Sequence, residues 1–191
     1  LYFFNWYVIK IIMTEKRRIS WEEYHEAIDR LALQIAESNF KVSHVISVAR
    51  GGLRVGDILS RLFRCKSSYL GVESYVSAAE GQVADKQKED VIFGRDISST
   101  TKDFGKSIII ADDLVDSGMT LDKSCIWLSN HEYFKGKKDI IFKTAVLYKK
   151  PESKFTPDYL VHDLPDNPWL IFPYEESELV TIADLKKKYN K

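Results

Sequence analysis

Apolar residues recur along the chain in two patterns: short continuous runs and longer amphipathic segments. Ser20 and Glu23 form a capping box, and the apolar residues behind it return every three or four positions, which predicts a helix from Trp21. The short runs predict five strands, at Val42–Ala49, Tyr69–Tyr75, Ile108–Ala111, Ile140–Tyr148 and Tyr159–Val161. Amphipathic segments predict three more helices, at Leu53–Phe63, Thr120–Ser129 and Thr181–Tyr189. This alternation predicts an α/β fold with a central, mostly parallel sheet flanked by helices.

Two segments do not follow these patterns. Residues 77–104 are polar, carry charges of both signs and show no sustained period, so we expect a flexible loop over 76–104 that is either a mobile excursion or a cover for a site. Residues 1–12 are apolar but lack the basic start and cleavage site of a signal peptide. We interpret them as an extension ahead of a natural start at Met13, with an extra strand or dimer-contact segment as the alternative. Residues 13–191 are then expected to form a single domain.

Composition narrows the class of protein. The chain has 191 residues, which suits one domain, and its 28 basic and 28 acidic residues cancel. This balance provides no charge-based reason to expect nucleic acid or a membrane surface as a partner. Cys65 and Cys125 lie far apart without the spacing of a metal site, which is typical of reduced thiols in a cytoplasmic protein. No apolar run approaches the roughly 20 residues that span a bilayer.

Three aspartates follow the most strand-like segment, in the sequence "IIIADDLVDSGMTL" at Ile108–Leu121. They are Asp112, Asp113 and Asp116, and they lie where the carboxyl end of a parallel strand opens into the ligand crevice of α/β proteins. Adjacent carboxylates are tolerated there if they accept hydrogen bonds from sugar hydroxyls or lie beside a divalent cation.

The next four residues, Ser117, Gly118, Met119 and Thr120, lead into a predicted helix. Backbone N–H groups, two hydroxyls and the positive end of a helix make a site for a phosphate dianion, and Gly118 permits its close approach. The whole stretch therefore predicts a diol acceptor beside a phosphate site, which matches the two ends of ribose 5-phosphate. The alternative is an ordinary turn whose aspartates cap the helix, but one aspartate would suffice for that.

Two further motifs are weak signals alone but gain weight beside the predicted sugar-phosphate site. Arg50-Gly51-Gly52 follows another predicted strand and could form a second anion site, although Gly-Gly turns are common. Lys150 follows the fourth predicted strand, where its ammonium could donate to a carbonyl oxygen on a heterocycle. Trp169 could stack on the ring. Taken singly, a Lys-Pro turn and a core tryptophan are the plainer readings.

Together these residues resemble the type I phosphoribosyltransferases. "IIIADDLVDSGMTL" is similar to that family's motif for 5-phosphoribosyl 1-diphosphate (PRPP), and "VISVARGGLRVGDILSRLF" to its diphosphate loop and following helix. "VLYKKPESKFTPDYLVHDLPDNPWLIFPYE" resembles the bacterial xanthine-guanine branch of the 6-oxopurine enzymes. The resemblance covers about Ile19–Glu175 apart from residues 77–104, and it implies the type I fold with a flexible hood loop.

The resemblance also implies roles for individual residues. Asp112 and Asp113 would hold the ribose hydroxyls, with Asp112 next to Mg²⁺ directly or through water. Asp116 would accept a proton from purine N7. The remaining assignments are the 5-phosphate site (Asp116, Ser117, Gly118, Met119, Thr120), the diphosphate site (Arg50 and Gly51, after a peptide bond Ala49–Arg50 that is often cis in relatives), the purine site (Lys150, Trp169, Leu170, and less firmly Glu175) and a basic hood residue (Lys86, Lys88 or Arg95).

The implied activity is transfer of the 5-phosphoribosyl group from PRPP to N9 of xanthine, guanine or hypoxanthine, with release of diphosphate. This is purine salvage by a cytoplasmic enzyme, expected to be a homodimer or homotetramer. One alternative is a pyrimidine or orotate phosphoribosyltransferase. Another is a non-catalytic regulator that senses the sugar diphosphate, although Met13–Asn39 holds one capped helix and no second recognition helix.

Overall fold

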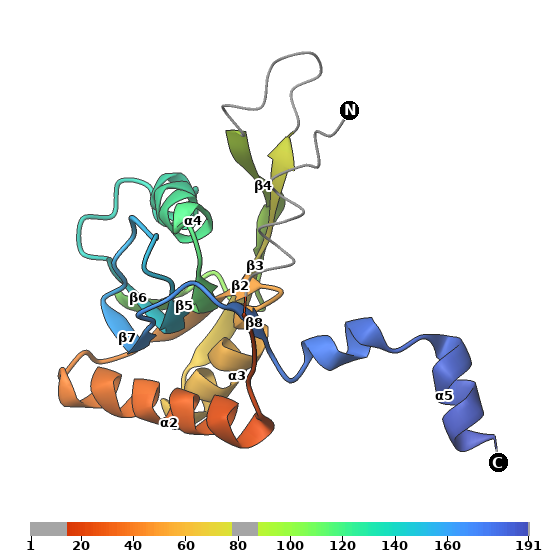
Figure 1. The fold of residues 1–191 in the computed structure, drawn as a ribbon. Helices are drawn as coiled ribbons and strands as arrows, with labels where there is room; N and C mark the ends of the chain where they lie inside the picture. Colours follow the sequence, from red (N-terminus) through yellow and green to blue (C-terminus); the bar gives the residue numbers. More distant parts are fainter. Residues whose placement is uncertain (1–14, 78–87, 191) are drawn as a thin grey trace. The chain divides into compact units, whose positions relative to one another are not determined.

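The structure is a computed structural model that describes residues 15–77 and 88–190 (Figure 1). Its contacts divide the chain into two units, a larger one at Ile28–Pro165 and a smaller one made of residues 1–27 and 166–191. The single domain over 13–191 thus stays a prediction, and each unit is described by itself. In chain order the elements are β1 (Lys16–Arg18), α2 (Trp21–Glu37), β2 (His44–Ala49), α3 (Gly52–Leu62), β3 (Lys66–Ser77), β4 (Lys88–Ser98), β5 (Ser107–Val115), α4 (Met119–Asn130), β6 (Ile141–Lys149), β7 (Tyr159–Asp163), β8 (Trp169–Ile171), the 3₁₀ helix η1 (Glu175–Leu179) and α5 (Ile182–Tyr189).

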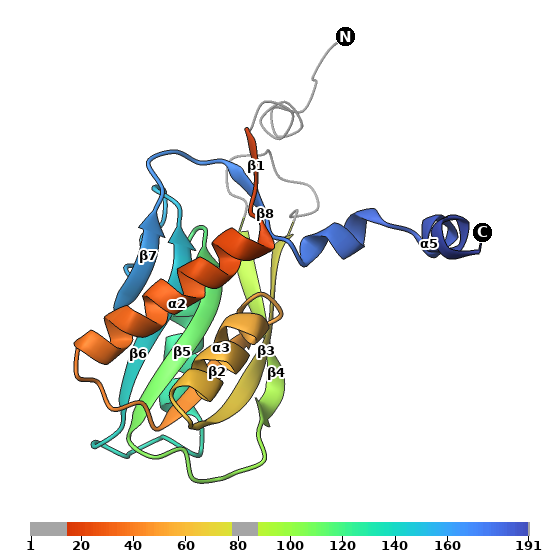
Figure 2. The same cartoon turned by 90° about the horizontal axis from the view of Figure 1, so that it is seen from below.

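The larger unit is built on a six-stranded sheet in the order β4-β3-β2-β5-β6-β7. All neighbours are parallel except β3 and β4, so the prediction of a mostly parallel sheet flanked by helices is confirmed. Figure 2 shows α2 and α3 over one face, and Figure 1 shows α4 over the other. The carboxyl ends of β2, β5 and β6 consequently meet at one edge of the sheet.

Alternation along the central strands supplies both faces of the core. Ile108 and Ile110 of β5 pack in one cluster with Leu121 and Leu128 of α4. The intervening residues point to the other face, where α3 lies close to β2. Gly56 permits this approach, since a Cβ there would come within 3.0 Å of the Ser47 Cβ. Ile108 and Ile110 therefore face α4, whereas Ile109 between them faces α3.

The prediction of a loop over 76–104 is wrong for part of that range. β3 continues to Ser77, and residues 88–98 form β4, an edge strand that pairs antiparallel with β3. An edge strand is held by backbone hydrogen bonds to a single neighbour and needs no continuous apolar run, so its sequence carries a weak signal. Residues 78–87 and the predicted extension at 1–12 lie outside the described residues.

The smaller unit contains the parallel pair β1–β8 and an aromatic cluster. Ile19 N donates to Ile171 O at 2.9 Å, and the buried Tyr24 ring lies 6.0 Å from Phe172. The predicted C-terminal helix is present as α5, where Thr181 and Asp184 form a capping box. No helix within residues 15–77 and 88–190 is both long and apolar enough to cross a membrane.

His44 is fully buried at the start of β2, away from the carboxyl edge of the sheet. Its Nε2 lies 2.7 Å from the Ser68 hydroxyl, and its ring packs 4.6 Å from the ring of Phe104. Burial, assisted by the charge of Lys66 and opposed by Asp103, lowers the pKa of His44 to about 4. The native protein consequently keeps this imidazole neutral.

We expect His44 to make the protein less stable as the pH falls from about 6.5 to about 4. Only the unfolded chain binds the proton in this window, so stability is fully present above it. The contribution lost between pH 7 and pH 5 is about 1–2 kcal/mol once solvent screening is allowed for. Urea unfolding at both pH values should show a smaller loss for His44→Gln. His25→Gln is the control, because His25 is exposed, and its loss of unfolding free energy should equal that of the parent. If His44→Gln lost as much stability between pH 7 and pH 5 as the parent does, the assignment to His44 would be contradicted.

Candidate active site

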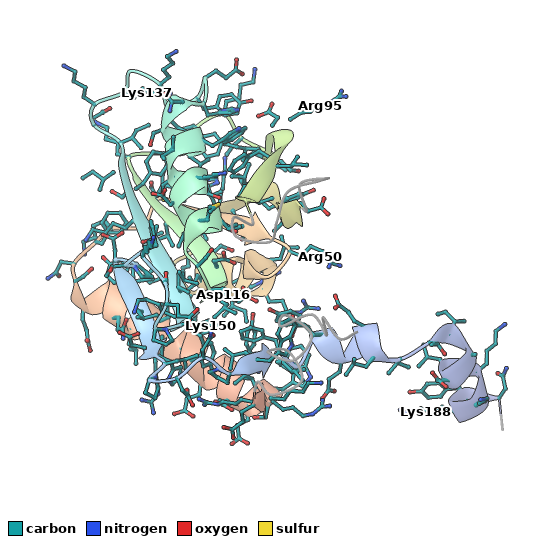
Figure 3. All side chains as sticks on the ribbon, turned by 45° about the horizontal axis from the view of Figure 1, so that its top comes forward. Arg50, Arg95, Asp116, Lys137, Lys150 and Lys188 are labelled. Atoms are coloured by element: carbon teal, nitrogen blue, oxygen red, sulfur yellow. The ribbon has the colours of Figure 1, made fainter. Side chains whose placement is uncertain are left out.

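Three loops at the carboxyl edge of the sheet carry most of the predicted site residues. Arg50 and Gly51 follow β2, Asp116 follows β5, and Lys150 follows β6. Because these strands are parallel and adjacent, their ends lie together. Figure 3 shows Asp116 and Lys150 side by side.

The Arg50-Gly51-Gly52 turn packs directly on the aspartates of β5. A Cβ on Gly51 would lie 2.6 Å from Asp113 Cγ, and one on Gly52 would lie 3.0 Å from Asp112 Cα. A Cβ on Gly52 would also clash with the backbone oxygen of Ala111, so this contact requires glycine at position 52, whereas a side chain at position 51 would have to displace the Asp113 carboxylate. The peptide bond Ala49–Arg50 is cis, as the resemblance implied.

Asp112 and Asp113 are both buried at the end of β5, with 6% and 9% of their surface exposed. Asp113 N donates to Asp112 Oδ1 at 3.0 Å. Burial and the neighbouring charge of Asp113 raise the pKa of Asp112 well above its usual range. Two crowded carboxyls are costly for the protein alone, and a cation or a set of ligand hydroxyls would relieve that cost.

The loop after β5 leads into α4 through Gly118, which has φ +88° and occupies the N-cap position. Asp116 and Ser117 are exposed, whereas Gly118 is buried under Ser153 and Phe155. Lys154 N donates to Ser117 O at 3.3 Å, which ties the loop to the segment after β6. The N–H groups of the first turn of α4 have no carbonyl partner within the helix, and Met119 N donates to Ser117 Oγ at 3.4 Å. A helix start of this kind suits an anion, and the phosphate site predicted from the sequence stays a prediction. The contribution of Ser153 and Phe155 was not predicted, because no motif marks them.

We expect Gly118→Ala to cost about 2–4 kcal/mol of unfolding free energy. The positive φ costs a side chain about 1–2 kcal/mol, and the new Cβ would meet Ser153 Oγ at 2.8 Å. Gly136→Ala is the control, because Gly136 has φ +79° with nothing within 4 Å. Urea unfolding should separate the two variants. Equal losses would show that the contact with Ser153 and Phe155 contributes nothing.

Lys150 forms an ion pair with Asp116, with Nζ 2.9 Å from Oδ2. The Lys150 side chain is 9% exposed, whereas that of Asp116 is 63% exposed. Lys150 N also donates to Val115 O at 2.9 Å, so the backbone positions this ammonium beneath the loop. The pair brings together the two residues that were predicted to meet the same edge of a purine ring.

One predicted residue of the larger unit, Arg95, is not brought into this group. Arg95 lies on β4 beside the second half of α4, and Figure 3 shows it apart from Arg50 and Asp116. The Lys86 and Lys88 side chains lie outside the described residues. Trp169 and Leu170 belong to β8 of the smaller unit, where Trp169 is 52% exposed and Leu170 is buried. A core tryptophan is thus excluded.

Glu175 has a local structural contact in the smaller unit. Its Oε2 accepts a hydrogen bond from Phe172 N at 2.8 Å, at the turn into η1. A role near the base stays a prediction for this residue.

Among residues 15–77 and 88–190, no three His, Cys, Asp or Glu side chains gather into a metal-binding cluster. Mg²⁺ is often held by one or two carboxylates together with waters and phosphate oxygens of a substrate. The buried pair Asp112 and Asp113 supplies that kind of partial donor set. The residues present therefore fit a magnesium ion that arrives with a phosphorylated ligand.

Comparisons with known proteins agree with this geometry. The family described as the phosphoribosyl transferase domain matches residues 20–178. The xanthine-guanine phosphoribosyltransferase of Idiomarina loihiensis is 29% identical over 159 residues, which cover 82% of this chain and 85% of that protein. The corresponding protein of Gluconobacter oxydans is 26% identical over 164 residues, with 84% and 85% covered. The solved purine phosphoribosyltransferase from Pyrococcus horikoshii has a TM-score of 0.62 at 28% identity, covering 83% of this chain and 93% of that one.

Proposed function

The chain belongs to the phosphoribosyltransferase family, and from this premise we propose that it transfers the 5-phosphoribosyl group of PRPP to N9 of a 6-oxopurine. The relatives named xanthine-guanine and purine phosphoribosyltransferases support this substrate class. The single observation that carries it is the Lys150–Asp116 pair, with 2.9 Å between its charged atoms. In guanine, N7 and O6 lie on the same edge of the ring. One side chain of the pair can donate to O6 while the other accepts the proton at N7.

The two loops and the aspartates between them would hold the sugar diphosphate. The N–H groups of Ser117–Thr120 and the positive end of α4 receive the 5-phosphate. Asp112 and Asp113 accept hydrogen bonds from the ribose hydroxyls. Arg50 and the N–H of Gly51 bind the diphosphate at the other end. This arrangement grips the sugar on both sides of its anomeric carbon.

During transfer the bond from the anomeric carbon to the diphosphate oxygen breaks, and a bond to purine N9 forms. The anomeric carbon gains oxocarbenium character, as in glycoside chemistry. Arg50 and the backbone amides stabilise the departing diphosphate. Asp116 takes the N7 proton of the purine, and Lys150 stabilises charge at O6. Holding the two reactants in place supplies roughly 7–11 kcal/mol of the barrier.

Magnesium fits this scheme through Asp112 and Asp113. When bound, it neutralises charge on the diphosphate. Burial and Asp113 raise the pKa of Asp112 and so disfavour its ionised form. A cation beside it would favour the ionised carboxylate and lower that pKa. Five further points remain predictions. They are the stacking of Trp169 on the base, the contact of Leu170 with its edge, a basic hood residue, a cytoplasmic location, and assembly into a homodimer or homotetramer.

The decisive assay incubates the protein with Mg²⁺, PRPP and one base at a time, and follows diphosphate release. Guanine, xanthine and hypoxanthine are the test bases, and orotate and uracil are the controls. We expect turnover with at least one 6-oxopurine and none with the pyrimidines. Turnover with orotate alone would establish the alternative enzyme. Binding of PRPP without turnover on any base would establish a regulator.

A further inference from the structure

A second hollow of about 710 Å³ lies between β4 and α4. Its volume falls in the range of small-molecule sites. We call it the α4–β4 groove, and it is lined by Phe93, Arg95, Asp96, Lys123, Ile126, Trp127, Asn130, His131 and Glu132. Apart from Arg95, which is one of three candidates for the hood contact with diphosphate, the residues assigned to PRPP or the base do not line it.

The floor of the groove is apolar and partly aromatic. The rings of Phe93 and Trp127 lie 5.6 Å apart at 17°, and Ile126 beside them is 57% exposed. The fold explains why Ile126 is exposed and why Phe93 and Trp127 are only partly buried, because β4 is the edge strand of the sheet and α4 leaves part of it uncovered (Figure 1). An apolar surface of this kind gains free energy when a flat ring covers it.

Arg95 supplies a positive charge at the same groove. Its side chain is exposed, and it forms no ion pair or hydrogen bond within the described part of the chain. A guanidinium that no described residue pairs with presents a planar fork of donors that matches a phosphate. The groove thus combines an apolar floor with an available anion contact.

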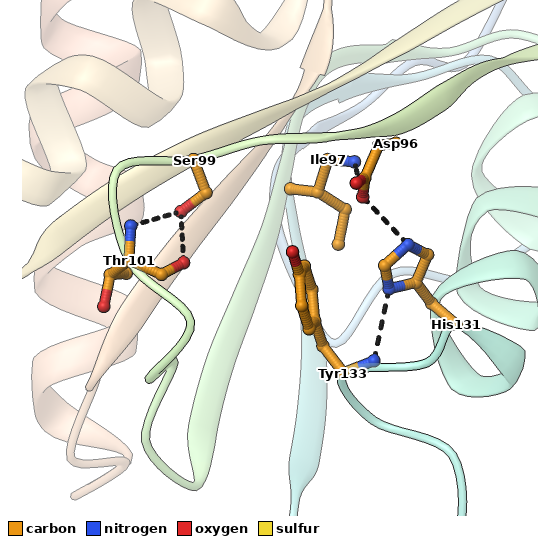
Figure 4. Close-up of polar contacts among 6 residues, drawn as sticks. All are labelled: Asp96, Ile97, Ser99, Thr101, His131 and Tyr133. Carbon is orange, nitrogen blue, oxygen red and sulfur yellow. Dashed lines mark hydrogen bonds and ion pairs between the residues drawn. The ribbon is translucent and has the colours of Figure 1, made fainter.

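The end of the groove is held in place by Asp96 and His131. Asp96 Oδ1 accepts from Ile97 N at 2.7 Å and from His131 Nε2 at 3.0 Å (Figure 4). Tyr133 N donates to His131 Nδ1 at 3.4 Å. These contacts fasten the end of α4 to β4. They also engage Oδ1 of the Asp96 carboxylate. Asp96 and the other acid, Glu132, are both exposed to solvent, which screens their charges.

We propose that the α4–β4 groove is a second ligand site that binds a nucleoside monophosphate. The base lies against Trp127 and Ile126, and the phosphate binds Arg95. Asn130 lies among the lining residues, where its Nδ2 donates to Ile126 O at 2.9 Å and its Oδ1 can accept a hydrogen bond from the polar edge of the base. The site is separate from the catalytic crevice and does not depend on the reaction proposed above.

Equilibrium dialysis with radiolabelled guanosine 5′-monophosphate tests this site. We expect the parent protein to bind two nucleotides per chain, one in the crevice and one in the groove. Ile126→Glu places a charge on the exposed floor and should abolish the groove site alone, with unchanged turnover. Arg95→Ala should weaken the groove site about tenfold. Lys137→Glu, an exposed charge reversal outside the groove, should leave both sites intact.

A crevice variant, Thr120→Glu, makes the outcomes separable. It repels phosphate from the start of α4, so one nucleotide should remain, and Thr120→Glu/Ile126→Glu should bind none. If Thr120→Glu binds none, or if Ile126→Glu binds as the parent does, the groove is not a site. If the proposed enzymatic function is the part that fails, the parent binds one nucleotide, which Ile126→Glu removes and Thr120→Glu does not. Circular dichroism of each variant verifies folding.

Discussion

Asp116→Asn is expected to lower turnover at least 100-fold while the affinity for PRPP changes only a few-fold. Asparagine keeps the size of the side chain but cannot accept the purine proton, and general base catalysis typically contributes 10²–10⁴-fold. The Asp116 side chain is 63% exposed, so the substitution should not disturb folding. Turnover is measured by diphosphate release, and PRPP affinity by calorimetry.

The matched control for this prediction is Asp122→Asn. Asp122 is an exposed acid in the first turn of α4, close in sequence but outside the group at the crevice. Its variant should retain turnover within twofold to threefold of the parent. If Asp116→Asn also stays within a few-fold, Asp116 does not take the proton, and the role passes to another group.

Lys150→Gln is expected to raise the KM for the purine about 30- to 100-fold. The ammonium is buried and bonded to Asp116 at 2.9 Å, so a neutral amide loses a charge-assisted donor to O6. Such hydrogen bonds contribute about 1.5–3 kcal/mol. The substitution also removes the buried cation beside Asp116, so turnover should fall as well. Steady-state kinetics with varied base at saturating PRPP measures both constants.

The neighbouring lysine offers a close control. Lys149 Nζ lies 2.7 Å from Asp163 Oδ1, and its side chain is 13% exposed, so Lys149→Gln breaks a similar pair one residue earlier, at the last position of β6. We expect its KM for the purine to stay near that of the parent. In the double variant Lys150→Gln/Asp116→Asn, the loss of activation free energy should be smaller than the sum of the losses in the two single variants, because the two residues interact. Full additivity would contradict a functional pair.

The parallel strands and the loop after β5 were the most predictable features. The run Ile108–Ala111, the aspartates after it and the glycine before α4 all carry their signal within a few residues. Apolar period and turn chemistry act locally, so the printed chain suffices to place them. The strand at Lys88–Ser98 was missed for the opposite reason, since pairing with β3 stabilises it and its own composition does not.

The sequence by itself determined the α/β class, the order of the main elements and the identity of the acidic and basic residues at the strand ends. Only the tertiary structure decided which of them meet. Asp116 and Lys150 are separated by 34 positions, and their pairing depends on β5 and β6 lying next to each other. Strand order also brings the Gly51 turn into contact with Asp113, and it places Arg95 in the α4–β4 groove. Strand order is settled by packing across the whole sheet, a long-range free energy that no local pattern encodes.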